Sequence, residues 1–323
     1  IRRMGESETL VSVTRRRFLT YSDAFAGMKA NVGLLARYGA RCRVPLMVSF
    51  AADRLAHGED DALRDLWTCW ESPYDWLCGL ALEIPHDAPA YQPPKRVLLE
   101  DFELFLAREF ADEERGLYLA VKGGHNDTSH NHNDVGAVSV FADGQPILLD
   151  AGAGTYTAKT FGPERYTIWN MRSDYHNLPT VCGADQQQGR EYRATDFRAG
   201  EDFCTMELRD AYGTGAGIRS FRRTAALQGG KVTLTDDIFL STAGEVVFHL
   251  LTDTKPTECT DGAFVLHGRR LTYPAGLEMT VEEVEHTSPE TARIPIAWGV
   301  PTLWRVNLTS RAAKEHHVTV EIQ

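Results

Sequence analysis

The sequence has no long apolar run, no CxxC pair and no excess of positive charge. Without an apolar run of about 20 residues, a helix that spans a membrane is not expected. The 6 cysteines are spread over 323 residues, which excludes a disulfide scaffold. Lys and Arg number 34 against 45 Asp and Glu, a net charge of −11 at pH 7. Because such a surface repels phosphates, nucleic acid is not an expected partner.

The hydrophobic pattern changes at a proline-rich stretch over residues 85–95. Before it, runs at 22–37, 44–56 and 60–82 favour helices, with Ser22 and Asp23 as a cap for the first run. After it, short β-type runs predict strands at 117–121, 137–141, 147–149, 220–227, 232–240, 245–252, 263–267, 278–284, 302–308 and 317–322. We therefore expect an α+β chain, with a helical segment and linker over 1–95 and a large antiparallel β-sandwich over 96–323.

The region 96–323 contains one clear turn signal. Ala142-Asp143-Gly144 separates two short β-type runs. Asp-Gly is a preferred pair for a tight turn between antiparallel strands. The sequence therefore predicts a β-hairpin at these residues.

The stretch GGHNDTSHNHNDVG at 123–136 holds three of the 11 histidines within eight residues. An ordinary turn explains Asn, Asp and Gly but not three histidines, and polar loops on a rigid scaffold are where functional sites concentrate. His130 and His132 are two residues apart, so on a strand both side chains would lie on one face. Imidazole is a common ligand for zinc and similar ions.

Two downstream residues complete a candidate metal site with His132. Asp150 follows the apolar run Pro146-Ile147-Leu148-Leu149, where an unpaired carboxylate would be costly unless it bound a cation. His176 precedes another short β-type run. Two His and one Asp can hold zinc and leave a position for water. The simpler alternatives are a turn cap for Asp150 and a hydrogen-bonded core histidine for His176.

The segment 164–172 supplies aromatic and cationic side chains close to these ligands. Tyr166 is an ionisable phenol, Trp169 can stack on a sugar face, and Arg165 and Arg172 can pair with carboxylate or sulfate. The simpler alternatives are a core aromatic for Trp169 and surface charges for the arginines. The glycines of 150–156 do not form a dinucleotide fingerprint, because GxGxxG needs a third glycine and a following helix.

Taken together, these residues resemble the heparinase II/III family of polysaccharide lyases. The motifs that carry the resemblance are GGHNDTSHNHNDVG at 123–136, LLDAGAGTY at 148–156 and YHNLPT at 175–180. The resemblance implies the last helices of an incomplete (α/α) toroid followed by a β-sandwich. It also implies cleavage of uronic-acid polysaccharides by β-elimination.

The resemblance further implies roles for individual residues. It assigns His132, Asp150 and His176 to a largely structural metal site, commonly zinc, although another divalent cation would fit. It places His130 in the active site, and Tyr166 in the stretch where alginate-cleaving relatives have an active-site tyrosine. The candidate substrate-binding residues are Asn131, Trp169, Arg165 and Arg172.

The sequence departs from the family in its first part. There the main base and acid, an Asn or His with a Tyr, come from the toroid, and residues 1–110 contain no matching motif. His57, Tyr38 and Tyr74 are present in other contexts. We therefore expect an upstream toroid domain or a partner chain to supply these groups, with a homodimer left open. The expected substrate is an anionic polysaccharide or oligosaccharide of the heparin, heparan sulfate or alginate type.

Three other functions share features with this sequence. A cupin-like metal enzyme also begins its motif with HxH, but it needs a Glu a few residues later, and residues 133–137 contain none. A metalloprotease is disfavoured because HExxH is absent. A non-catalytic carbohydrate-binding sandwich stays open, since stacking aromatics and arginines also serve binding alone. The expected compartment is the bacterial periplasm or cytoplasm.

Overall fold

The computed structural model describes residues 2–28, 30–57 and 88–323. The chain divides into two compact units. The first comprises Ile1–Leu19, Gly27–Pro94 and Ala111–Glu114, and the second comprises Thr20–Ala26, Lys95–Phe110 and Arg115–Gln323. The helix expected within 60–82 lies outside the described residues. No helix in the described ranges is long and apolar enough to cross a membrane.

The first unit is helical. It contains α1 (Arg2–Leu10), the short strands β1 (Ser12–Thr14) and β2 (Arg17–Phe18), α2 (Val32–Cys42) and α3 (Pro45–Ala56). The helix expected over 44–56 is confirmed as α3, which has Pro45 at its start, where a missing N–H costs nothing. Leu35 of α2 and Met47 and Phe50 of α3 are buried together in the core of this unit.

The helix expected over 22–37 is wrong in its first half. The helix begins at Val32, where the side chain of Asn31 accepts a hydrogen bond from the Leu34 N–H at 2.9 Å. Ser22 and Asp23 therefore do not cap a helix. They lie in Thr20–Ala26, which belongs to the second unit. Tertiary contacts of this segment outweigh its local helix propensity.

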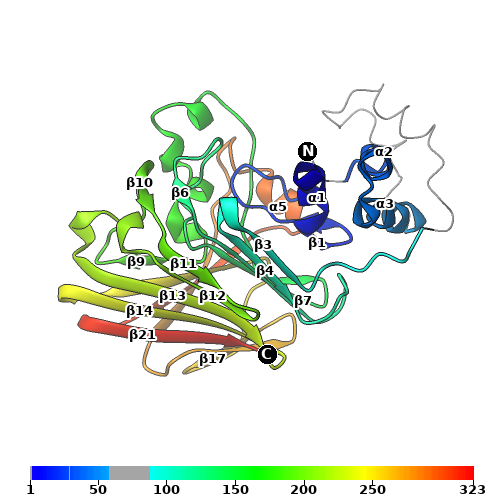
Figure 1. Cartoon of the computed structure of the whole chain (residues 1–323). Coiled ribbons are helices and arrows are strands. Elements are labelled where there is room, and N and C mark those ends of the chain that lie inside the picture. Colours follow the sequence, from blue (N-terminus) through cyan, green and yellow to red (C-terminus); the bar gives the residue numbers. More distant parts are fainter. Residues whose placement is uncertain (1, 29, 58–87) are drawn as a thin grey trace. The chain divides into compact units, whose positions relative to one another are not determined.

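The second unit is built from antiparallel sheets (Figure 1). A five-stranded sheet has the order β3 (Arg96–Leu99), β4 (Leu104–Arg108), β5 (Leu117–Lys122), β7 (Val138–Ala142) and β8 (Gln145–Leu148). An eight-stranded sheet has the order β11 (Thr195–Ala199), β12 (Phe203–Glu207), β13 (Ile218–Gln228), β14 (Lys231–Gly244), β21 (Ala313–Ile322), β18 (Arg269–Thr272), β17 (Ala263–Leu266) and β16 (Thr257–Thr260). A four-stranded sheet has the order β19 (Glu278–Glu283), β20 (Trp304–Thr309), β15 (Val246–Thr252) and β9 (Pro179–Val181).

Two smaller elements complete this unit. The strands β6 (His125–Asn126) and β10 (Gly189–Arg193) pair with each other, and a short helix α5 spans Ile294–Trp298. Between β8 and β9 the chain has no strand. It makes four single turns of 3-10 helix, η3 (Lys159–Phe161), η4 (Arg165–Thr167), η5 (Trp169–Met171) and η6 (Ser173–Tyr175). This irregular segment can therefore present side chains at several angles.

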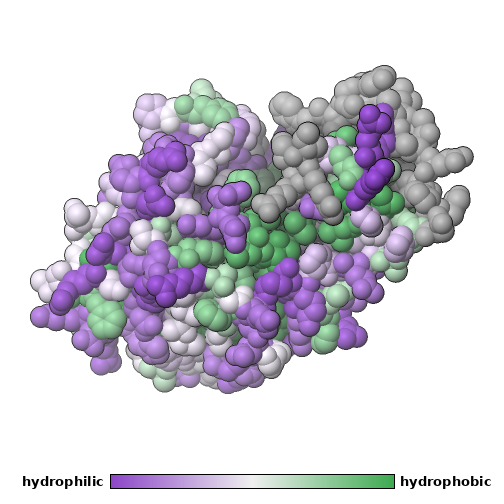
Figure 2. All heavy atoms as spheres, viewed as in Figure 1, coloured by the Kyte–Doolittle hydropathy of each residue, from purple (hydrophilic) through white to green (hydrophobic). Residues whose placement is uncertain are grey.

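The expected α+β class with a large antiparallel sandwich is confirmed. Strands β13 and β14 of the eight-stranded sheet contact β5 of the five-stranded sheet, and one hydrophobic core unites side chains of all three large sheets. Burial alternates along β13 and β14, as it does in strands with one face on a core. The side of these strands visible in Figure 2 is accordingly mainly hydrophilic.

The hairpin expected at 142–144 is also confirmed. Strands β7 and β8 pair in register through Ala142 and Gln145, and Asp143 and Gly144 form the turn between them. Both turn residues have positive φ, 48° for Asp143 and 76° for Gly144. Two positive φ values in succession are the signature of the type I′ turn, which Asp-Gly favours.

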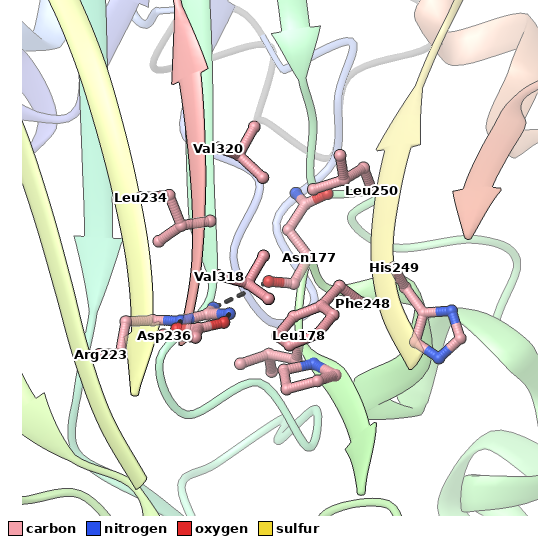
Figure 3. A pocket seen from close by; sticks show the side chains of 11 residues that line it. Asn177, Leu178, Arg223, Leu234, Asp236, Phe248, His249, Leu250, Val318 and Val320 are labelled. Atoms are coloured by element: carbon pink, nitrogen blue, oxygen red, sulfur yellow. Dashed lines mark hydrogen bonds and ion pairs between the residues drawn. The ribbon is translucent and has the colours of Figure 1, made fainter. Parts of the chain in front are cut away.

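A buried ion pair lies at the centre of the sandwich (Figure 3). Arg223 of β13 and Asp236 of β14 stand opposite each other in the strand register and form two hydrogen bonds of 2.7 and 2.6 Å. The remaining Arg223 nitrogen donates to the backbone oxygens of Gly136 and Asn177, each at 2.8 Å. Gly136 ends the histidine-rich stretch and Asn177 follows His176. This one side chain therefore ties both site segments to the sandwich.

Candidate metal centre and active site

The histidine-rich stretch is a loop. Residues 127–137 connect β6 to β7 without strand structure, so the strand spacing that would put His130 and His132 on one face does not apply. His130 has a φ of 58°, which turns the backbone sharply before His132. The two imidazoles therefore differ in environment. The side chain of His132 is fully buried, whereas that of His130 is 49% exposed.

The residues expected to bind a metal are brought together. His132, Asp150 and His176 are all buried, and each offers a ligand atom within 4.8 Å of the other two. The three come from the loop before β7, the end of the run after β8 and the last 3-10 turn before β9. Two imidazoles and one carboxylate are a typical ligand set for zinc.

The buried ring of His132 suits a metal ligand. Its Nε2 donates a hydrogen bond to a carboxylate oxygen of Asp23 at 2.9 Å. Burial lowers the pKa of His132, which keeps the imidazole neutral. Its Nδ1 has no hydrogen-bond partner among the described residues. A buried nitrogen lone pair without a partner is costly, and coordination of a cation would remove that cost.

His176 and Asp150 also suit a metal site, because their side chains contact each other directly. The His176 Nδ1 lies 2.6 Å from a carboxylate oxygen of Asp150, and its Nε2 lies 3.0 Å from the backbone oxygen of Asn170. Burial disfavours a charge on His176, but the neighbouring Asp150 carboxylate outweighs it and raises the pKa of His176. A divalent cation could take the place of the proton between Nδ1 and the carboxylate, while Nε2–H continues to donate to Asn170.

The turn-cap role of Asp150 and the core hydrogen bond of His176 are both present in addition to the triad. The second carboxylate oxygen of Asp150 accepts a hydrogen bond from the Gly152 N–H at 3.1 Å, as a turn cap would. His176 is a fully buried, hydrogen-bonded histidine. Both contacts orient the ligand atoms and leave the triad intact.

An unexpected residue, Asp23, joins the two histidines of the loop. One carboxylate oxygen accepts from His132 Nε2 at 2.9 Å and from Arg165 at 3.0 Å. The other accepts from His130 Nδ1 at 2.9 Å and from the Tyr156 hydroxyl at 3.0 Å. Burial alone would raise the pKa of Asp23, but the contacts with His132, Arg165 and His130 hold that pKa well below its usual range.

His130 lies among exposed aromatic rings. The rings of Tyr156 and Phe161 are 5.0 Å apart, and each lies about 6 Å from the His130 ring, at 6.0 and 6.1 Å. Tyr156 is 45% exposed and Phe161 is 64% exposed. Burial and the Asp23 carboxylate raise the pKa of Tyr156 to about 12. An imidazole with one nitrogen anchored and its side chain half-exposed can meet a substrate.

The neighbouring candidates from the sequence are held inside the protein. All three Arg165 nitrogens are engaged, with the backbone oxygens of Asn131 and Thr160 and with Asp23. The Asn131 amide donates to the Tyr166 hydroxyl at 3.1 Å. Burial raises the pKa of Tyr166, and Arg165 does not offset it.

Trp169 and Arg172 make contacts of another kind. The Trp169 ring packs 4.9 Å from the Tyr175 ring. Arg172 pairs with Asp174 at 2.9 Å and with Asp185 at 3.4 Å. Within the described part of the chain, no hydrogen bond, ion pair or ring contact links these two side chains to His130. Their role in binding a substrate stays a prediction.

A comparison with known protein families matches the part of the chain that carries these residues. Residues 106–294, more than half of the chain, match the family described as heparinase II/III-like, C-terminal. The chain belongs to this family. The match includes His130, His132, Asp150 and His176 but not Asp23.

Solved structures show the same fold. The chain is similar to a heparinase III, the BT4657 gene product, with a TM-score of 0.68, 14% identity and coverage of 99% of this chain and 45% of the other. It is also similar to heparan sulfate lyase HepC from Pedobacter heparinus, with a TM-score of 0.62, 12% identity and coverage of 99% and 46%. The chain thus spans a little under half the length of these heparinase structures. No curated protein sequence matches the chain significantly.

Asp23 is one of the site residues, together with Tyr156 and Phe161, that the sequence patterns did not reveal. It lies 107 residues before His130 in a segment without a motif. Several hydrogen bonds join this segment to the rest of the second unit, three of which involve backbone oxygens of Asp150, Ala120 and Ala24. Thr20 donates to the Asp150 backbone oxygen at 2.7 Å, Tyr21 to that of Ala120 at 3.0 Å, and the Ala153 N–H to that of Ala24 at 2.9 Å. Only the fold brings this carboxylate to the loop.

Proposed function

We propose that this chain is the C-terminal part of a polysaccharide lyase that cleaves uronic-acid-containing glycans of the heparin, heparan sulfate or alginate type by β-elimination. The observation that carries the proposal is the half-exposed His130, anchored by Asp23 and next in the loop to the buried His132–Asp150–His176 triad. Membership in the heparinase II/III-like family supports it. An upstream helical domain or a partner chain would supply the remaining catalytic groups.

The reaction sets three tasks. A base takes the proton from C5, which is acidic because it lies next to the uronate carboxylate. The C4–O bond then breaks, its electron pair leaves with the oxygen, and a C4–C5 double bond forms. An acid protonates the leaving oxygen. A third group must stabilise the negative charge that builds up on the carboxylate.

His130 is suited to the third task. Its Nδ1 donates to Asp23, which leaves Nε2 for a substrate. A protonated imidazole there would donate a hydrogen bond to the uronate carboxylate and stabilise the charge that develops on it. The exposed rings of Tyr156 and Phe161 beside it offer apolar faces on which a sugar ring can pack.

Tyr166 has a narrower role in this proposal. Its raised pKa keeps the phenol protonated, so it would act as a hydrogen-bond donor or acid and not as a ready base. His132, Asp150 and His176 would hold a divalent cation, with zinc as the expected ion. When bound, the cation would supply positive charge that fixes these three side chains and the loop that carries His130.

The proposal is tested with the protein expressed from its complete gene. It is incubated with heparin, heparan sulfate, alginate and other uronate polymers while ultraviolet absorbance is followed. The conjugated double bond of the product absorbs in this range. We expect absorbance to rise with at least one polymer, which identifies the substrate class. A protein that binds a polymer but gives no rise with any would favour the carbohydrate-binding alternative and contradict the lyase.

A further inference from the structure

The carboxylate of Asp23 accepts hydrogen bonds from four side chains of the site. Asp23 lies outside residues 106–294, which match the family. Its side chain is 4% exposed, and its two oxygens receive four hydrogen bonds. The donors are two imidazoles, a guanidinium and a phenol. Such a buried carboxylate is stabilised because every contact is a donor and one of the donors, the Arg165 guanidinium, carries a positive charge.

The division of contacts between the two oxygens is specific. One oxygen faces His132 and Arg165, and the other faces His130 and Tyr156. Guanidinium groups can only donate hydrogen bonds, so the first position must hold an acceptor. The second position holds an acceptor for the N–H of His130. A carboxylate meets both demands, whereas an amide can meet only one.

We infer that Asp23 is a positioning residue that sets the tautomers of both loop histidines at once. By accepting from His132 Nε2 it leaves the buried Nδ1 of that ring for a cation. By accepting from His130 Nδ1 it leaves Nε2 of that ring for a substrate. The segment Thr20–Ala26 is thus a functional part of the second unit. The inference concerns orientation and holds whether or not the proposed lyase reaction is correct.

Two substitutions separate the effect of Asp23 on His132 from its effect on His130. In Asp23→Asn, Arg165 fixes the amide oxygen on its own side, where it still accepts from His132. The amide nitrogen then faces His130 and donates to Nδ1, so His130 must carry its proton on Nε2. In Asp23→Ala both contacts are lost. Asp127→Asn is the matched control, because Asp127 is an exposed carboxylate of the same loop that contacts an imidazole, among the described residues, only through its backbone N–H.

Zn²⁺ affinity is measured by titration calorimetry on the full chain, and the histidine tautomers are read from imidazole ¹⁵N chemical shifts at about pH 9, where imidazole is neutral in general. Loss of a carboxylate that orients a metal-binding histidine lowers metal affinity about 10–100-fold, which is the expected result for Asp23→Ala. Asp23→Asn should keep an affinity close to that of the unaltered chain but shift the His130 proton from Nδ1 to Nε2. Asp127→Asn should change neither.

The outcomes are distinguishable. An Asp23→Ala chain that binds Zn²⁺ as the unaltered chain does, or an Asp23→Asn chain with His130 still protonated at Nδ1, would overturn the inference. If the unaltered chain binds no Zn²⁺, the proposed metal site fails, and the His130 tautomer still decides the role of Asp23. If Asp23→Ala does not fold, the His130 tautomer in Asp23→Asn decides the inference on its own.

Discussion

Replacement of His130 by Ala is expected to lower the turnover of uronate polymer by about 10²–10⁴-fold, the usual contribution of a positioned acid or base group. The fall should appear mainly in kcat, because the side chain is proposed to act on charge that develops during the reaction. The rate is read from the ultraviolet absorbance of the unsaturated product, with the protein expressed from its complete gene.

His125→Ala is the matched control for this prediction. His125 lies five residues earlier, on β6, and its Nδ1 accepts only a local hydrogen bond from the Asp127 N–H at 3.2 Å. Its replacement should leave turnover close to that of the unaltered protein. Equal turnover in His130→Ala and His125→Ala would remove His130 from the reaction.

Replacement of Arg223 by Met is expected to lower the free energy of unfolding by about 3–5 kcal/mol, the usual cost of leaving a buried charge without its partner. Asp236 would lose both of its hydrogen bonds from Arg223, and the backbone oxygens of Gly136 and Asn177 would lose a shared donor. Urea denaturation followed by circular dichroism measures the change.

The neighbouring Arg222 provides the control. It lies on the same strand, and its partly exposed guanidinium pairs with Asp196 at 2.8 Å. Arg222→Met should change the free energy of unfolding by no more than about 1 kcal/mol, as for other surface ion pairs. The double variant Arg223→Met with Asp236→Leu should regain much of the lost stability, because no buried charge is then left unpaired. A single Arg223→Met variant as stable as Arg222→Met would contradict a central role for this pair.

The elements predicted correctly from the sequence are those whose signals are local. The Asp143-Gly144 turn needs only two residues, and the strands β13, β14 and β21 show alternation over many residues. The candidate metal-binding triad, whose side chains the structure brings together, was accessible for a similar reason. Asp150 ends an apolar run, His132 lies in the histidine-rich stretch and His176 precedes a short β-type run, and each of these patterns involves only neighbouring residues.

The missed elements depend on distant contacts. Strands β10 and β11 carry alternating charged and polar residues that resemble a loop, and only their neighbours β6 and β12 define them as strands. Asp23 was interpreted as a helix cap because Ser-Asp before a helix-forming run is a common capping pattern. Its actual partners lie more than 100 residues away, which no local pattern can encode. The domain boundary at 95–96 and the catalytic roles of the site residues stay predictions.

The most direct test of the site is the amount of zinc that the chain holds after dialysis against Zn²⁺ and removal of excess ion. We expect one Zn²⁺ per chain, and none after His176→Ala, because a three-ligand site cannot retain its ion with one ligand lost. His317→Ala removes an exposed histidine and should leave the content at one. Anomalous X-ray diffraction would then place the ion within about 2.0–2.2 Å of His132, Asp150 and His176. A chain that holds no zinc, or holds the same amount after His176→Ala, would contradict a metal centre at these three residues.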